Sequence, residues 1–290
     1  MVRGKKLIRN LVWGVYFCLP LILLALLLIP IKRARAEVTE LVLINQDSWV
    51  LSGGSVKSVV TGNDGTTYLG GFFTQIGPYV GSFVSLDSST GQYDNTFPKV
   101  VGDVSTVTSD GLGGWYIGGK FSKVGNYERQ NLAHILSDKT VDPNWNPNAN
   151  DTVNTLVINN NIIYAGGRFT TMGGQTRNRL AAIDVGGSVT SWNPNAGHTV
   201  TTLVINNSII YAGGWFTTTG GQTRNHLAAI NVGGTLTSWN PNANDFVYTL
   251  AVNNNTIYAG GWFTTMGGQT RNHLAAINVG GDTDVVESGC

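Results

Sequence analysis

The sequence predicts an all-β protein built from repeated units, and three observations carry this prediction. The segment 163–171 (Ile-Tyr-Ala-Gly-Gly-Arg-Phe-Thr-Thr) returns almost unchanged at 210–218 and 257–265. Its tyrosine recurs at steps of 47 or 48 residues, and a period of about 40 to 50 residues is typical of propellers and solenoids. Only 12% of the residues are charged, as in turn-rich β proteins. We expect the recurring tyrosines to be structural: Tyr68, Tyr116, Tyr164, Tyr211 and Tyr258.

Residues 1–36 are predicted to be a signal peptide or a signal anchor. Four basic residues precede an apolar run of 21 residues, 11–31, which is followed by Ala34-Arg35-Ala36. The Ala-x-Ala ending favours cleavage after Ala36, whereas the run is long enough for a helix to span a bilayer of about 30 Å. In both cases we expect residues 37–290 to be secreted or held at the cell surface. Contact with a membrane is expected only through residues 11–31, if they are not removed.

Copy three of the repeat shows the expected strands most clearly. Apolar runs predict strand A at 153–158 and strand B at 162–169, joined by a tight turn of three asparagines. A longer connection leads to strand C at 180–185, and a Gly-Gly turn leads to strand D at 188–192. Four short antiparallel strands of this kind make one blade of a β-propeller.

Residues 37–290 are therefore predicted to form one β-propeller of about five four-stranded blades. A fourth-strand aromatic residue stands 19 residues before each copy's tyrosine, and the first of these is Trp49. A closed ring would need the strand around Trp49 to complete the last blade, which hides both sheet edges. The alternative is an incomplete ring, the propeller part of a larger surface protein. The five repeats span about 45–92, 93–140, 141–187, 188–234 and 235–281.

The glycine pair inside strand B, Gly166-Gly167 in copy three, would weaken an ordinary strand. We therefore predict a β-bulge or a close approach of two backbones at this point.

Three motifs of copies three to five resemble a known family. Trp-Asn-Pro-Asn-Ala, Ile-Tyr-Ala-Gly-Gly-x-Phe-Thr and Gly-Gly-Gln-Thr-Arg-Asn-x-Leu-Ala-Ala-Ile are similar to the delta-60-type β-propeller repeats of exported bacterial proteins. The resemblance covers roughly residues 45–281 and implies a propeller in an extracellular setting. That family has no defined activity, so the resemblance implies no reaction.

The long B–C and D–A loops lie at one end of each blade, and we predict that this end is the working surface. The residue after the glycine pair differs from copy to copy. Copies four and five agree at 34 of 43 positions, and four of their nine differences fall in the D–A loop and at the start of strand A. Tryptophans here could stack on sugar rings or anchor a protein partner, or they could pack between blades. The candidate binding residues in these two regions are Lys120, Arg168, Trp215, Trp262, Phe246 and Tyr248.

Two further sets recur near the same loops. Asp103, Asp151 and Asp245 precede strand A, with His198 and Ser55 at the matching places, and could contact cations or sugar hydroxyls or cap a turn. One arginine recurs in the B–C loop and could hold an anion, although donation to loop carbonyls is the interpretation we favour. These arginines, expected to be structural, are Arg129, Arg177, Arg224 and Arg271.

Composition and motifs argue against several function classes. Residues 37–290 carry a formal charge of −6, so we expect no nucleic-acid partner. The repeats show neither metal-ligand spacing nor a nucleophile with a base, so we expect no metal, no cofactor and no enzymatic activity. The hypothesis is a binding or structural scaffold for a glycan or protein at the cell envelope. The alternative is an enzyme of quinoprotein or glycosidase type on the same scaffold.

Overall fold

The computed structural model describes residues 55–62, 67–72, 82–94 and 96–280. The predicted leader, Trp49 and the side chain of Tyr68 lie outside the described residues. Every regular element in the described part is a β-strand, and none of it is a helix that could span a membrane.

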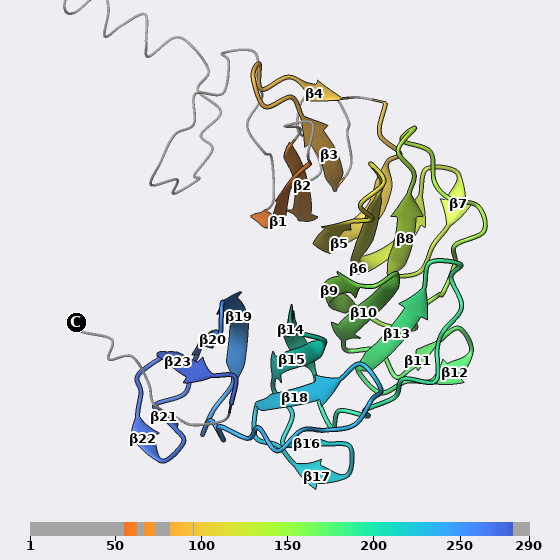
Figure 1. Ribbon diagram of the computed structural model, residues 1–290. Helices are drawn as coiled ribbons and strands as arrows, with labels where there is room; N and C mark the ends of the chain where they lie inside the picture. The colour runs from red at the N-terminus through yellow and green to blue at the C-terminus, as the bar shows by residue number, and fades with distance from the viewer. Residues whose placement is uncertain (1–54, 63–66, 73–81, 95, 281–290) are drawn as a thin grey trace, which may run out of the picture. The chain divides into compact units, whose positions relative to one another are not determined.

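Five antiparallel sheets follow one another in chain order, each beside the next (Figure 1). We call them blades one to five. Blade one holds β1 (Ser55–Thr61), β2 (Thr67–Phe72), β3 (Phe83–Leu86) and β4 (Tyr93–Asp94), and blade two holds β5 (Val100–Ser109), β6 (Trp115–Val124), β7 (Tyr127–Glu128) and β8 (Leu132–Ile135). Strands A, B and C are β9 (Val153–Asn159), β10 (Ile162–Gly167) and β13 (Leu180–Asp184) in blade three, and β14 (Val200–Asn206), β15 (Ile209–Gly214) and β18 (Leu227–Asn231) in blade four. In blade five they are β19 (Val247–Asn253), β20 (Thr256–Gly261) and β23 (Leu274–Asn278). The predicted all-β propeller fold is confirmed.

The fourth strand is shorter than predicted in blades two to four. In blade three it pairs with strand C through the single bridge Ile183–Val189, and the N–H of Thr190 donates to the carbonyl of Ala182 at 2.8 Å. The chain leaves the sheet at Trp192, whose indole Nε1 donates to the carbonyl of Asn231 at 3.1 Å. Because Pro194 follows and has no N–H, a longer ladder is not available.

The B–C connection contains a small hairpin that the sequence did not predict. It pairs β11 (Thr171–Met172) with β12 (Gln175–Thr176), β16 (Thr218–Thr219) with β17 (Gln222–Thr223), and β21 (Thr265–Met266) with β22 (Gln269–Thr270). Two glycines with positive φ form each turn, Gly173 and Gly174 in blade three. The loop end of blades three to five is therefore held by backbone pairing.

The glycine pair of strand B forms the predicted bulge and also lies where backbones crowd. Gly166 pairs with Thr155 and Gly167 with Val153, so the register shifts between the two glycines. A Cβ on Gly166 would lie 2.6 Å from Cγ1 of Val200 in the next blade, and a Cβ on Gly167 would lie 2.2 Å from the carbonyl oxygen of Thr152. Both sites therefore exclude a side chain.

Adjacent blades share a recurring hydrogen bond. The N–H of Leu203 in β14 donates to Oγ1 of Thr155 in β9 at 3.2 Å. The N–H of Leu250 donates to Oγ1 of Thr202 at the same distance. With the same bond from Leu156 to Thr106, strand A in each of blades three to five is tied to strand A of the preceding blade.

We expect Thr155→Val to lower the free energy of unfolding by about 1–3 kcal/mol, because the buried N–H of Leu203 loses its acceptor while the side-chain shape is kept. Urea denaturation measures the change. Thr217→Val, at an exposed threonine in the loop after β15, is the control. Equal losses in the two variants would contradict a role for the shared hydrogen bond.

Candidate functional site

The residue after each glycine pair lies beside the D–A loop of its own blade. The N–H of Trp215 donates to the carbonyl of Thr199 at 2.9 Å, and the N–H of Trp262 donates to the carbonyl of Phe246 at 2.9 Å. Arg168 makes the same contact with Thr152 in blade three. The two sequence regions that vary between copies therefore meet at the loop end of the blades.

Blades four and five bring their variable side chains together in a row of rings. The rings of Trp215 and Phe246 are stacked, with centroids 4.9 Å apart and planes at 19°. His198 stacks on Trp215 at 5.9 Å, and Trp262 lies 6.4 Å from Phe246 with its plane tilted by 30°. Tyr248 meets Trp262 edge-on at 5.5 Å. We call these five residues the aromatic row.

The two tryptophans have different surroundings. Trp215 has Phe246 and His198 stacked against it, and the Arg168 guanidinium carbon lies 5.9 Å from its ring centroid. Trp262 is 62% exposed. An exposed indole face can receive an apolar ring face, whereas an indole that neighbouring rings already stack against has little face to offer. Trp262 is therefore the stronger candidate for ligand contact, and Trp215 organises the row.

The polar residues before strand A cap its first turn. Oδ1 of Asp151 accepts the N–H of Thr152 at 2.6 Å, and Oδ1 of Asp245 accepts the N–H of Phe246 at 2.7 Å. His198 does the same through Nδ1, which accepts the N–H of Thr199 at 2.8 Å. Asp151 and His198 are exposed and Asp245 is half-buried, so capping leaves the remaining polar atoms of the first two near solvent.

Asp103 is not equivalent to Asp151, contrary to the expectation from spacing. Asp103 lies inside β5 opposite Lys120, and its structural counterpart in blade three is Thr152. The A–B turn of blade two holds one residue more than that of blade three, so counting back from the tyrosine shifts the register. Burial raises the pKa of Asp103, and Lys120 and Lys57 partly oppose the shift.

His226 packs under the aromatic row and was not singled out from the sequence. Its ring meets Phe246 edge-on at 5.5 Å, and Nδ1 lies 3.2 Å from the carbonyl oxygen of Gly214. Burial lowers the pKa of His226, while the Gly214 carbonyl and Asp245 oppose the shift. His226 stands 15 residues after the repeat tyrosine, as Asn131 and His273 do, and this recurring position could have identified it from the sequence.

We expect the protein to lose stability as the pH falls below about 6.5. The unfolded chain binds a proton at His226 in this window, whereas the folded chain resists it because the pKa is lowered. The slope of the unfolding free energy between pH 7.5 and pH 5 should be smaller in His226→Asn. Asparagine suits the site because Asn131 holds the equivalent position at φ 67°, against φ 65° for His226.

His273→Asn, at the exposed equivalent in blade five, is the control for this measurement. It should keep the wild-type slope. If His226→Asn also kept that slope, the burial of His226 would not be the cause.

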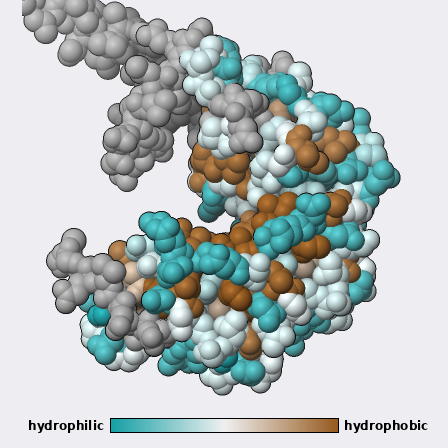
Figure 2. Space-filling view, in the orientation of Figure 1, coloured by the Kyte–Doolittle hydropathy of each residue, from teal (hydrophilic) through white to brown (hydrophobic). Residues whose placement is uncertain are grey.

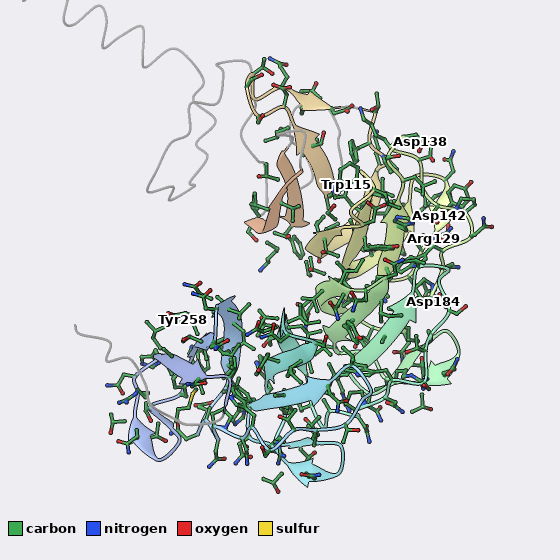
Figure 3. The ribbon with its side chains drawn as sticks, viewed as in Figure 1. Trp115, Arg129, Asp138, Asp142, Asp184 and Tyr258 are labelled. Atoms are coloured by element: carbon green, nitrogen blue, oxygen red, sulfur yellow. The ribbon has the colours of Figure 1, made fainter. Side chains whose placement is uncertain are left out.

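The four recurring arginines donate to carbonyls of their own blade. Nη2 of Arg129 donates to the carbonyl of Asp142 at 2.9 Å, and the two residues lie side by side in Figure 3. Arg177 and Arg224 donate in the same way to Thr190 and Thr237, at 2.6 Å and 3.0 Å. The side chains of these three arginines are buried. They offer little surface to an anion.

Recurring tyrosines pack against the fourth-strand tryptophan of the next repeat. Tyr164 meets Trp192 and Tyr211 meets Trp239, each with ring centroids 5.1 Å apart. Burial raises the pKa of both hydroxyls. Tyr258 is partly exposed.

Blade two holds a cluster that the repeat pattern did not predict. Nδ1 of His134 lies 3.0 Å from a carboxylate oxygen of Asp142, and Nε2 lies 3.2 Å from one of Asp110. The imidazole stacks on Tyr116 at 4.3 Å. Burial alone would raise the pKa of Asp142, but hydrogen bonds from His134 and the N–H of Asn144 lower it. In the described ranges, no group of three His, Cys, Asp or Glu side chains is arranged to hold a metal ion.

A family model supports the repeat assignment. The model described as "Domain of unknown function (DUF5122) beta-propeller" matches residues 208–236 and 253–285, which contain strands B and C of blades four and five. These two segments are similar to the repeats of that family. The resemblance to delta-60-type repeats is thereby confirmed. No curated protein matches the chain.

Several solved structures are similar to the chain at low identity. The computationally designed Ika8 protein is 11% identical over 83% of this chain and 88% of that one, with a TM-score of 0.42. The extracellular domain of the one-component system BT4673 from B. thetaiotaomicron is 10% identical over 80% of this chain and 29% of that one, with a TM-score of 0.49. A catalytically inactive virginiamycin B lyase from Staphylococcus aureus, with quinupristin, is 13% identical over 84% and 72%, with a TM-score of 0.43. At these values the similarities assign no function.

The aromatic row is divided between matched and unmatched parts of the DUF5122 repeats. Trp215 and Trp262 lie within the matched segments, whereas His198, Phe246 and Tyr248 fall outside them. The ring partners of the two tryptophans therefore belong to D–A loops and the start of β19, which the family model does not match.

Proposed function

We propose that the protein is a non-enzymatic, exported β-propeller that binds a glycan at the cell surface through the aromatic row. The observation that carries the proposal is the geometry of Trp262, whose indole is 62% exposed beside Phe246 and Tyr248. Sugar rings present flat C–H faces to such indoles. The adjacent carboxylate of Asp245 is half-buried and provides acceptors for hydroxyl groups.

Rigidity of the row supports a binding role. Trp215 is held by stacked neighbours, so the row pays little ordering entropy when a ligand arrives. The hairpin β21–β22 and the caps at Asp245 and His198 hold the flanking loops by backbone hydrogen bonds. Preorganised rings on loops are typical of recognition surfaces on a stable scaffold.

A glycan array probed with the full-length protein tests the proposal. Binding to a defined set of sugars is expected. A blank array at high protein concentration would overturn the glycan assignment, and turnover of a bound glycan would favour a glycosidase instead.

We expect Trp262→Ala to weaken glycan binding at least tenfold, about 1.4 kcal/mol, while the fold is kept, because the indole is largely outside the core. Titration calorimetry with the sugar identified on the array measures the change. Leu112→Ala, at an exposed leucine of the opposite turn in blade two, should bind as the wild type does. Unchanged affinity in Trp262→Ala would place the ligand elsewhere.

A further inference from the structure

Blades three, four and five each cover one face of the blade before them in the same way. Tyr211 and Leu227 of blade four are buried in one hydrophobic cluster with Val247 and Leu250 of blade five. Tyr164 and Leu180 of blade three are buried with Val200 and Leu203 of blade four. We call the side that offers tyrosine and leucine the receiving face, and the side that offers the two residues of strand A the inserting face.

The receiving face of blade five is open. Tyr258 is 38% exposed and Leu274 is 51% exposed, although their equivalents in blades three and four are buried. Thr249, the equivalent of the hydrogen-bond acceptors Thr155 and Thr202, is also exposed. Figure 3 shows Tyr258 on the side of blade five that points away from blade four.

The inserting face of blade one is open as well. Val56 pairs with Gly71 as Val247 pairs with Gly261, and Val59 pairs with Leu69 as Leu250 pairs with Ala259. Val59 is 58% exposed and Val56 is also exposed, whereas Val247 and Leu250 are buried. Figure 2 shows hydrophobic surface, in brown, over β1.

We propose that the receiving face of blade five binds the inserting face of blade one in a second copy of this chain. Both faces are open in the same molecule, so neither covers the other within one chain. The two faces are the halves of an interface that recurs between the inner blades, and Val56 and Val59 occupy the positions that cover Tyr211 and Leu227 inside the chain. The N–H of Val59 would then donate to Thr249, as that of Leu250 donates to Thr202.

The contact joins two different surfaces, so it is head-to-tail. Heterologous contacts of this kind close into rings or extend into chains, depending on the rotation between copies. Burying the exposed tyrosine, leucine and valines supplies the apolar driving force.

Sedimentation of the full-length protein in mild detergent, over a range of concentrations, tests the proposal. The wild type should self-associate. Leu274→Asp and Val59→Asp should each weaken association at least tenfold, because a carboxylate would be buried without a partner. Leu112→Asp, at a leucine 85% exposed on another surface, should associate as the wild type does. Thermal unfolding of each variant checks that it is folded.

Mixing the two damaged proteins gives the sharpest outcome. Leu274→Asp keeps an intact blade-one face and Val59→Asp keeps an intact blade-five face, so an equimolar mixture should form a one-to-one dimer. A monomeric wild type at every concentration would overturn the proposal and indicate that no second copy covers these faces. Failure of the mixture to associate, with only Leu274→Asp defective, would overturn it in favour of pairing between like faces.

Discussion

Replacing Trp145 by alanine is expected to lower the free energy of unfolding by about 3–5 kcal/mol. Trp145 is among the largest fully buried side chains, and its ring lies 4.9 Å from that of Tyr116 in blade two. Its indole Nε1 also donates to the carbonyl of Asp184 at 3.3 Å. The substitution therefore removes a large apolar volume between two blades together with a hydrogen bond to β13 of blade three.

Thermal and urea denaturation measure this loss. Trp262→Ala is the matched control, because the same change at an exposed indole should cost about 1 kcal/mol or less. Comparable losses at Trp145 and Trp262 would contradict the assignment of Trp145 to the core.

Replacing His134 by alanine is the second large change, with an expected loss of about 3–5 kcal/mol. The imidazole stands between the carboxylates of Asp110 and Asp142, whose side chains are 8% and 19% exposed. Removing it leaves two largely buried carboxylates without their shared partner, and it also removes the ring stacked on Tyr116.

The repeats supply the control for this prediction. Blade three has Ala182 at the position of His134, and the carbonyl of Thr190 accepts from its arginine as that of Asp142 does in blade two. The double variant His134→Ala, Asp142→Thr should therefore be more stable than His134→Ala alone. If the double variant were the less stable of the two, the destabilisation of His134→Ala would not come from leaving the Asp142 carboxylate without its partner.

Local pattern was enough to predict the strands and the bulge. Apolar runs and asparagine turns place strands A, B and C of blade three within a few residues of β9, β10 and β13. The pair Gly166-Gly167 breaks the register as predicted because a glycine pair inside a strand has few other uses. The predicted fourth strand is longer than the observed one. Its residue pattern does not reveal that the chain leaves the sheet at Trp192, whose indole donates to the next blade.

The parts of the site that were not predicted depend on contacts between copies. Comparison of the copies identifies the variable residues. Their stacking in one row depends on how blade five is rotated against blade four, and the spacing of residues in the sequence does not predict that rotation. His134 and Asp110 have no like residue at the equivalent positions of the other copies, so the repeat pattern hides the cluster. The register of Asp103 depends on a single additional residue in a turn.

The recurring interface has a consequence for how such a chain can change in evolution. Strand A of blade five presents Val247 and Leu250 where blade four presents Val200 and Leu203. Loss or gain of one 47-residue unit in the gene would therefore join blades through side chains that already fit. The number of blades can therefore change in evolution while the contacts between adjacent blades are kept. The loops at the blade ends can change in sequence without altering those contacts.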